Sequence, residues 1–254
     1  MPIMNTIYQI SDCHLSDESS YENLRRALEY VNNDQECEAI FLTGDICCNP
    51  KPGDYTHLET FVRHLTNKSI YAIAGNHDDS RLMRAELKGS TICVTDRANV
   101  CGREFVFLDS SFKPKDSVHP LGSGRIDNRG LAQLKKQLRK ASNPIIIVHH
   151  PIIPVGADWM QAIRLENDFS IMKVLQKYGV REVICGHGHD QITTTQHGIT
   201  QYMAPSTAYG FDHSIEEYNR SDKIGLSKIS TSQHSFDYLA IYLWIFVFEL
   251  ARYS

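Results

Sequence analysis

Aspartate and histidine residues with metal-binding chemistry occur as two closely spaced pairs. Asp12 and His14 form the first pair, and His187 and His189 form the second within Gly-His-Gly-His. Side chains alternate between the two sides of an extended backbone, so both members of a pair would face one metal ion. The spacing therefore predicts that both members of each pair bind a metal ion from one side of the backbone, and that Cys13 and Gly188 face the opposite side.

Further polar residues follow other apolar segments of the chain. Gly44-Asp45 follows one segment, and Gly75-Asn76-His77-Asp78 and His149-His150-Pro151 follow two others. Ligands of open α/β sheets bind beyond the carboxyl ends of the strands. We expect these side chains and the two pairs to meet at one edge of a sheet. An aspartate after a strand, or a Gly-Asp dipeptide, is also common in turns and helix caps. The prediction of a metal site therefore depends on the occurrence of all these polar groups together.

Apolar, β-rich segments alternate with segments of helical period. The first kind predicts buried strands, the second predicts helices that pack one leucine-rich face, and their alternation predicts a mostly parallel sheet in the first half of the chain. Two threonine-rich segments, 193–195 and 200–203, predict an antiparallel hairpin. The strand segments are 6–10, 39–42, 70–74, 105–108, 145–148 and 182–185, and the helical segments are 24–31, 58–65, 131–138 and 171–175.

Composition describes a globular protein without an excess of positive charge. The 254 residues are 42% hydrophobic and 22% charged, which is enough apolar material for a sizeable core. A net charge of −4 argues against a protein that wraps nucleic acid, and the basic residues of 135–140 read as the solvated face of a helix. No linker or repeat divides the chain, so we predict a single domain over residues 1–254.

Cysteine usage and the N-terminal residues favour a cytoplasmic protein. The seven cysteines are an odd number without framework spacing, and the first residues lack the basic and apolar regions of a signal peptide. We interpret Cys47 and Cys48 as packing thiols. The apolar stretch 238–248 is shorter than the roughly 20 residues that cross a bilayer, which favours a buried strand or an interface segment.

Together the five polar blocks resemble the signature of the calcineurin-like metallophosphoesterase superfamily. This signature is Asp-x-His, Gly-Asp, Gly-Asn-His-Asp, a histidine before a proline-containing turn, and Gly-His-x-His, and all five blocks lie within residues 10–190. The resemblance implies a four-layer α/β/β/α sandwich with a dinuclear metal site at the carboxyl ends of the strands.

Carried over to this chain, the resemblance also implies a role for each residue. Asp12, His14 and His189 would bind one metal ion, Asn76, His149 and His187 the other, and Asp45 would bridge them. His150 stays open as the alternative to His149. His77, held by Asp78, would act beside the scissile phosphate as a general acid or electrostatic stabiliser. Oxygen and imidazole ligands suit Mn or Fe, with Zn or Co as alternatives.

Within the superfamily the chain resembles bacterial class III cyclic-nucleotide phosphodiesterases. Segments 10–15, 108–110, 149–152, 185–187 and 204–207 carry this resemblance. It implies that a metal-bridging hydroxide hydrolyses 3′,5′-cyclic AMP to 5′-AMP, with no nucleic acid as partner. The open alternatives are a phosphomonoesterase, a hydrolase of dinucleoside polyphosphates or of lipid-linked pyrophosphates, and a binding scaffold without catalysis.

The pocket walls and the C-terminal part are less well defined by these patterns. We expect residues 159–167 and 209–211 to line the pocket. After about Phe211 the chain departs from the phosphodiesterase group, and residues 212–254 form a divergent segment. Its end, 233–254, could be a strand buried on both faces, a contact between two copies of the chain, or a tail that touches a membrane.

Overall fold

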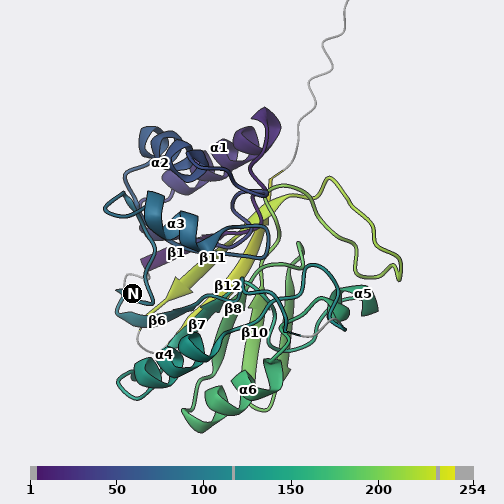
Figure 1. Cartoon of the computed structure of the whole chain (residues 1–254). Helices are drawn as coiled ribbons and strands as arrows, with labels where there is room; N and C mark the ends of the chain where they lie inside the picture. The colour runs from purple at the N-terminus through teal and green to yellow at the C-terminus, as the bar shows by residue number, and fades with distance from the viewer. Residues whose placement is uncertain (1–4, 116–117, 233–234, 244–254) are drawn as a thin grey trace, which may run out of the picture.

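Two mixed β-sheets pack face to face, and helices cover their outer faces (Figure 1). The computed structural model describes residues 5–115, 118–232 and 235–243. Figure 1 shows α1, α2 and α3 on one side of the paired sheets and α4 and α6 on the other. The four layers α/β/β/α are the sandwich that the family resemblance implies.

The first sheet has six strands in the order β12-β11-β1-β2-β3-β4. Its four N-terminal strands are parallel, whereas β11 pairs antiparallel with β1 and β12 pairs antiparallel with β11. These strands are β1 (Asn5–Ile10), β2 (Cys37–Thr43), β3 (Ser69–Ile73), β4 (Ile92–Cys93), β11 (Gly225–Thr231) and β12 (Phe236–Tyr242).

The second sheet has six strands in the order β5-β6-β7-β8-β10-β9. Strands β6, β7, β8 and β10 are parallel, and each edge strand pairs antiparallel with its neighbour. The predicted hairpin is confirmed as β9 and β10. The bounds are β5 (Arg97–Val100), β6 (Arg103–Leu108), β7 (Ile145–Val148), β8 (Glu182–Cys185), β9 (Ile192–Gln196) and β10 (Ile199–Met203).

The four predicted helical segments all form helices with their apolar faces buried. Leu24, Leu28 and Val31 of α1 are buried against the first sheet, and Ile171 and Leu175 of α6 against the second. The capping box of Asp17 and Ser20 begins α1. The helices are α1 (Glu18–Asn32), α2 (Asp54–Leu65), α3 (Ser80–Glu86), α4 (Asn128–Leu138), α5 (Asp158–Ala162) and α6 (Asp168–Lys177).

A third hydrophobic core lies between the two sheets, in addition to the two cores beneath the helices. The Phe41 ring of β2 contacts Phe105 and Phe107 of β6 with centroid separations of 4.9 and 5.4 Å. The neighbours of Phe41 in sequence, Ile40 and Leu42, are buried on the opposite face of β2, beneath the helices. Because both faces of the central strands are covered, these strands are continuous apolar segments.

The C-terminal segment adds a strand pair to the first sheet. Along β12 half-buried and exposed residues alternate, and Leu239 is 61% exposed, so 236–242 is an edge strand rather than one buried on both faces. Residues 244–254 lie outside the described residues. Within the described part of the chain, no helix has the length and apolar character that crossing a bilayer requires.

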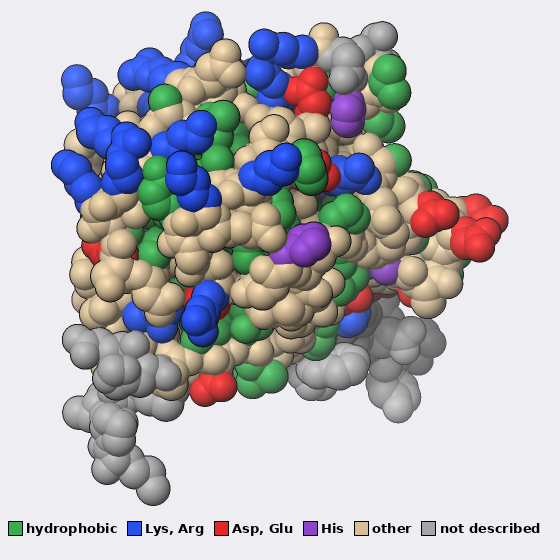
Figure 2. Space-filling model, turned by 90° about the horizontal axis from the view of Figure 1, so that it is seen from below, with side chains coloured by type: hydrophobic (Ala, Val, Ile, Leu, Met, Phe, Trp, Pro, Cys, Tyr) green, Lys and Arg blue, Asp and Glu red, His purple; other side chains and the backbone are tan. Residues whose placement is uncertain are grey.

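Basic side chains lie on the outer surface of α4 and beyond its C-terminus. Lys136, Arg139 and Lys140 are exposed, as a solvated helix face requires. Figure 2 shows Lys and Arg side chains gathered on the face seen from below, the side on which α4 and α6 lie in Figure 1.

Asp34, just after α1, connects the N-terminal and C-terminal strands of the first sheet. Its carboxylate accepts hydrogen bonds from Tyr8 Oη of β1 at 2.8 Å and from Lys228 Nζ of β11 at 2.7 Å. Burial alone would raise the pKa of Asp34, but the hydrogen bonds from Lys228 and Tyr8 outweigh it and lower the pKa to about 2.

We expect Asp34→Asn to lower the free energy of unfolding by about 1–3 kcal/mol at neutral pH, because it removes charge-assisted hydrogen bonds. The ionised carboxylate stabilises the fold above its ordinary pKa of about 3.9, and this contribution is lost as the pH falls through about 2. Urea titration at pH values from 7 down to 2 measures both effects. Asp237→Asn, on the exposed side of β12, is the matched control, and equal losses in the two variants would contradict the role of Asp34.

Candidate metal centre

The candidate ligands lie in loops that follow five parallel strands, three in one sheet and two in the other. Asp12 and His14 follow β1, Asp45 follows β2, and Asn76 follows β3. From the second sheet, His149 follows β7, and His187 and His189 follow β8. The carboxyl ends of both sheets therefore meet at one place. The expected convergence of the five polar blocks is confirmed, but the strands that carry them belong to two sheets rather than one.

Asp12, His14 and His189 form the first cluster. His189 Nε2 lies 3.2 Å from Asp12 Oδ1 and 3.2 Å from His14 Nε2. All three side chains are buried. Two imidazole nitrogens and a carboxylate oxygen that converge in this way form a suitable donor set for a divalent cation.

Asp45 lies between this first cluster and a second group of ligands. Its Oδ2 is 3.9 Å from His14 Nε2 and 3.4 Å from His149 Nε2. His149 Nε2 is also 3.9 Å from Asp12 Oδ1. The central position of the Asp45 carboxylate fits a residue that contacts two cations.

Two buried polar atoms at this place have no hydrogen-bond partner in the structure. They are His149 Nε2 and Asn76 Oδ1. An unpartnered polar atom costs about 1–3 kcal/mol when it is buried. Both atoms carry lone pairs, so a cation would satisfy them, and the residues present fit a bound metal.

Hydrogen bonds to backbone carbonyls orient three of the histidines. His149 Nδ1 lies 2.9 Å from Thr43 O, and His189 Nδ1 lies 2.8 Å from Tyr209 O. His187 uses the other nitrogen, with Nε2 3.0 Å from Ile163 O. A carbonyl accepts only from a protonated nitrogen, so each contact assigns the proton and leaves the opposite nitrogen as a ligand atom.

The neighbouring His150 makes different contacts. Its Nδ1 lies 2.8 Å from Ser110 Oγ, and its Nε2 lies 3.0 Å from Gly122 O. Both ring nitrogens are therefore engaged, whereas His149 Nε2 is open toward Asp45. These contacts favour His149 over His150 as the ligand.

The backbone around the ligands is not extended, contrary to the sequence interpretation. Asp12, His14, Asp45, His187 and His189 all have positive φ, between 45° and 73°. Left-handed turns after the strands, rather than alternation along a strand, therefore bring each pair together. The conformation costs about 1–3 kcal/mol at a residue other than glycine, and such strain concentrates at functional sites.

Close packing of the backbone explains the glycine before Asn76. A Cβ atom on Gly75 would lie 2.2 Å from Asp45 Oδ1 and 2.4 Å from the Asp45 backbone nitrogen. Any larger residue would therefore displace the central carboxylate.

The surroundings keep the carboxylates ionised and the rings of His14 and His187 neutral. Burial would raise the pKa values of Asp12 and Asp45, but nearby histidines outweigh it and hold both below the ordinary range. Burial lowers the pKa of His14 to about 4 and that of His187 to about 3. At His149 burial is outweighed by the charges of Asp45 and Asp12, which raise the pKa to about 9. The two carboxylates thus attract positive charge into the site.

Asp78 lies beneath this site and does not hold the His77 ring as the sequence interpretation expected. Burial, followed by the charge of Asp45, raises its pKa to about 6. Within the described residues its carboxylate braces the loops after β2 and β3, and the imidazole of His77 approaches Cys48 instead. Asp78 accepts hydrogen bonds from the backbone nitrogens of Ile46, Cys47 and Gly75 and from Tyr55 Oη, at 2.9–3.0 Å.

A cavity of about 1250 Å³ opens above the ligands. The expected walls are confirmed in part, since Trp159, Ile163, Tyr209 and Phe211 line it, whereas Gly210 and residues 164–167 are not among its lining residues. The sequence patterns missed Cys48 and Arg220. Cys47 is buried in the core as predicted, but Cys48 is half-buried and lines the cavity, so its interpretation as a packing thiol is wrong.

Comparison with known proteins identifies relatives that are similar to this chain over most of its length. A probable cyclic nucleotide phosphodiesterase of Psychrobacter sp. (strain PRwf-1) is 26% identical over 206 residues, which cover 76% of this chain and 58% of that protein. The chain thus matches less than two thirds of that relative's length. The 3′,5′-cyclic adenosine monophosphate phosphodiesterase CpdA of Vibrio vulnificus is 24% identical over 225 residues, covering 84% of this chain and 80% of that protein.

A solved structure shares the architecture. The crystal structure of a dimetal phosphatase from Danio rerio matches with a TM-score of 0.67 at 16% identity, covering 94% of this chain and 99% of that one. The family model described as calcineurin-like phosphoesterase matches residues 6–191. The chain belongs to the calcineurin-like phosphoesterase family.

Proposed function

We propose that this protein is a metal-dependent phosphodiesterase that hydrolyses 3′,5′-cyclic AMP to 5′-AMP. The observation that carries the proposal is the pair of unpartnered buried acceptors, His149 Nε2 and Asn76 Oδ1, beside the Asp12–Asp45 carboxylates. The printed names of the Psychrobacter and Vibrio relatives support a cyclic nucleotide as substrate.

The ligand set that we propose has two groups of three residues with Asp45 between them. Asp12, His14 and His189 hold one ion, and Asn76, His149 and His187 hold the other. When bound, two metal ions activate water for attack on phosphorus and stabilise the charge that develops there. Mn²⁺ and Fe suit these oxygen and imidazole donors, with Zn²⁺ and Co²⁺ as alternatives.

The charges of these residues suit an anionic substrate. Asp12 and Asp45 contribute two negative charges, whereas Asn76 contributes none, and a histidine that binds a metal ion does so as a neutral imidazole. Two divalent ions therefore leave the site with an excess of positive charge, which attracts a phosphodiester. Asn76 and the backbone turns fix the geometry without cancelling this excess.

His77 is the residue that we propose to act on the leaving group. It is half-buried and lines the cavity beside His14, with ring centroids 4.9 Å apart. During hydrolysis the bond from phosphorus to the 3′ oxygen breaks, and that oxygen takes the bonding electrons. A hydrogen-bond donor at His77 stabilises this charge. Asp78 contributes indirectly, as a positioning residue for the loop that carries His77.

A second candidate is a larger phosphoester, such as a dinucleoside polyphosphate. The cavity volume of about 1250 Å³ exceeds the roughly 300–1,000 Å³ of common small-molecule sites. At its rim the Arg220 guanidinium lies 3.9 Å from the centroid of the Tyr209 ring, and its Nε donates to Tyr218 Oη at 2.7 Å. A cation held in this way suits a substrate with an additional phosphate.

We also keep two predictions about the whole chain. We propose that residues 1–254 form one domain, which is supported by the pairing of β11 with β1 across the length of the chain. We further propose that the enzyme acts in the cytoplasm. Contact between two copies of the chain, or with a membrane through the apolar stretch 238–248, stays a prediction. Residues 244–248 of that stretch lie outside the described part of the structure.

A substrate panel tests the proposed function. Purified protein loaded with Mn²⁺ is offered cyclic AMP, bis(4-nitrophenyl) phosphate, 4-nitrophenyl phosphate and diadenosine tetraphosphate. We expect the highest kcat/KM on cyclic AMP, with 5′-AMP as product, and loss of turnover after the metal is removed by a chelator. Preference for diadenosine tetraphosphate would favour the second candidate, and turnover of none of the four would contradict both.

Metal stoichiometry tests the choice between the adjacent histidines. We expect His149→Ala to lower the content from two Mn²⁺ ions per chain to one, because it removes a ligand that Asp45 alone does not replace. His150→Gln should lower the thermal stability but retain two ions, since the ring of His150 bonds to Ser110 and Gly122. Elemental analysis after dialysis measures both contents. Loss of an ion in His150→Gln with retention in His149→Ala would reverse the assignment.

A further inference from the structure

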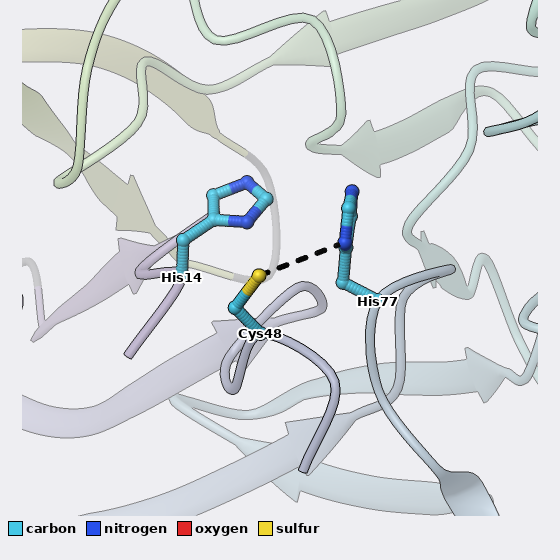
Figure 3. A group of neighbouring side chains, drawn as sticks. All are labelled: His14, Cys48 and His77. Atoms are coloured by element: carbon cyan, nitrogen blue, oxygen red, sulfur yellow. Dashed lines mark hydrogen bonds between the residues drawn. The ribbon is translucent and has the colours of Figure 1, made fainter. Parts of the chain in front are cut away.

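The thiol of Cys48 lies beside the imidazole of His77 at the edge of the metal centre (Figure 3). Cys48 belongs to the loop after β2, and His77 belongs to the loop after β3. Cys48 Sγ lies 3.9 Å from His77 Nδ1, within the range of hydrogen bonds to sulfur. Figure 3 also shows the second ring nitrogen of His77 directed away from Cys48.

The backbone of His77 is fixed by its own contacts. Its N–H donates to Asp45 Oδ1 at 2.8 Å, and its carbonyl accepts from the backbone of Asn49 at 3.0 Å. These bonds place the Cα atom but do not set the rotation of the imidazole. Among the described residues, Cys48 is the hydrogen-bond partner of that ring, since the Asp78 carboxylate is occupied beneath the loops.

The direction of this hydrogen bond decides which ring nitrogen of His77 carries the hydrogen. A thiol S–H is a donor, and His77 Nδ1 is the acceptor that lies within its reach. An S–H group that donates to Nδ1 leaves the ring hydrogen of a neutral imidazole on Nε2. The nitrogen that faces away from Cys48 is then a donor.

We propose that Cys48 is a positioning residue that holds His77 with its Nε2–H presented to the leaving oxygen of the substrate. This inference rests on the proposed function, because it requires that a phosphodiester be cleaved at the metal centre. A donor helps most where the leaving oxygen is strongly basic and bears most charge in the transition state. The contribution of Cys48 should therefore grow with the basicity of the leaving group.

Two esters of thymidine 5′-phosphate test this dependence, one with a 4-nitrophenyl and one with a phenyl leaving group. The two esters have the same nucleoside and the same charge, and phenolate is a more basic leaving group than 4-nitrophenolate. In the Mn²⁺-loaded full chain we expect Cys48→Ala to lower kcat on the phenyl ester about tenfold. The loss on the 4-nitrophenyl ester should be at least about fivefold smaller. His77→Asn should show the same pattern with larger losses.

Further variants separate positioning from a general loss of structure. Cys48→Ser keeps a hydroxyl donor and should recover much of the lost kcat on the phenyl ester. Cys93→Ala removes an exposed thiol of β4 that does not line the cavity, and it should leave both esters unaffected. Each variant is checked for two Mn²⁺ ions per chain and for an unchanged thermal transition.

The outcomes distinguish the inference from the function on which it rests. Equal losses on both esters in Cys48→Ala, or no loss on either, would overturn the role of Cys48 while the enzyme remains a phosphodiesterase. Failure of Cys48→Ser to recover activity would also argue against a donor at this position. Absence of turnover by the unmodified Mn²⁺-loaded chain would overturn the proposed function and this role with it.

Discussion

Two buried carboxylates without enough positive charge around them determine the rest of this site. Asp12 and Asp45 are 0% and 2% exposed, and imidazole nitrogens of the site lie 3.2–3.9 Å from their oxygens. An isolated carboxylate in such surroundings costs several kcal/mol unless a cation compensates it. Burial keeps His14 and His187 neutral, and the single positive charge of His149 does not balance two carboxylates, so compensating charge is still required. Metal ions supply it, and this requirement explains why imidazole nitrogens and an amide oxygen are directed toward the same place.

The sandwich supplies the rigidity that such a centre needs. The Phe41–Phe105–Phe107 contacts fix one sheet against the other, and the ligands stand on loops that leave the two sheets at one end. Ser206 Oγ donates a hydrogen bond to the backbone oxygen of Asp12 at 2.8 Å, and the backbone oxygen of Tyr209 accepts one from His189 Nδ1. The connection between β10 and β11 therefore links both ends of the first cluster. The left-handed turns at five ligands are stable because this framework holds them in place.

The elements and the candidate ligands were predictable from the sequence because their signals are local. The apolar segments 145–148 and 182–185 match β7 and β8, and glycine after helical periodicity marks the end of α6. The edge strands β4, β5 and β12 are short or half exposed, so hydrophobic pattern alone does not identify them. The division of the strands between two sheets came from the family resemblance, since strand order depends on contacts between distant segments.

The details of the site depend on packing that spacing does not encode. Asp-x-His suggests an extended backbone, yet left-handed turns at Asp12 and His14 bring these ligands together. The charge of Asp78 is suited to holding His77. Its carboxylate instead accepts hydrogen bonds from the backbone N–H groups of Ile46, Cys47 and Gly75. Cys48 then takes the place beside the imidazole. No local pattern distinguishes it from Cys47, which is buried one residue earlier.

Anomalous X-ray diffraction from crystals of the full chain grown with Mn²⁺ tests the central claim most directly. The account predicts two manganese peaks with the Asp45 carboxylate between them, one beside Asp12, His14 and His189 and the other beside Asn76, His149 and His187. A single peak, or two peaks that leave Asp45 in contact with neither, would contradict it.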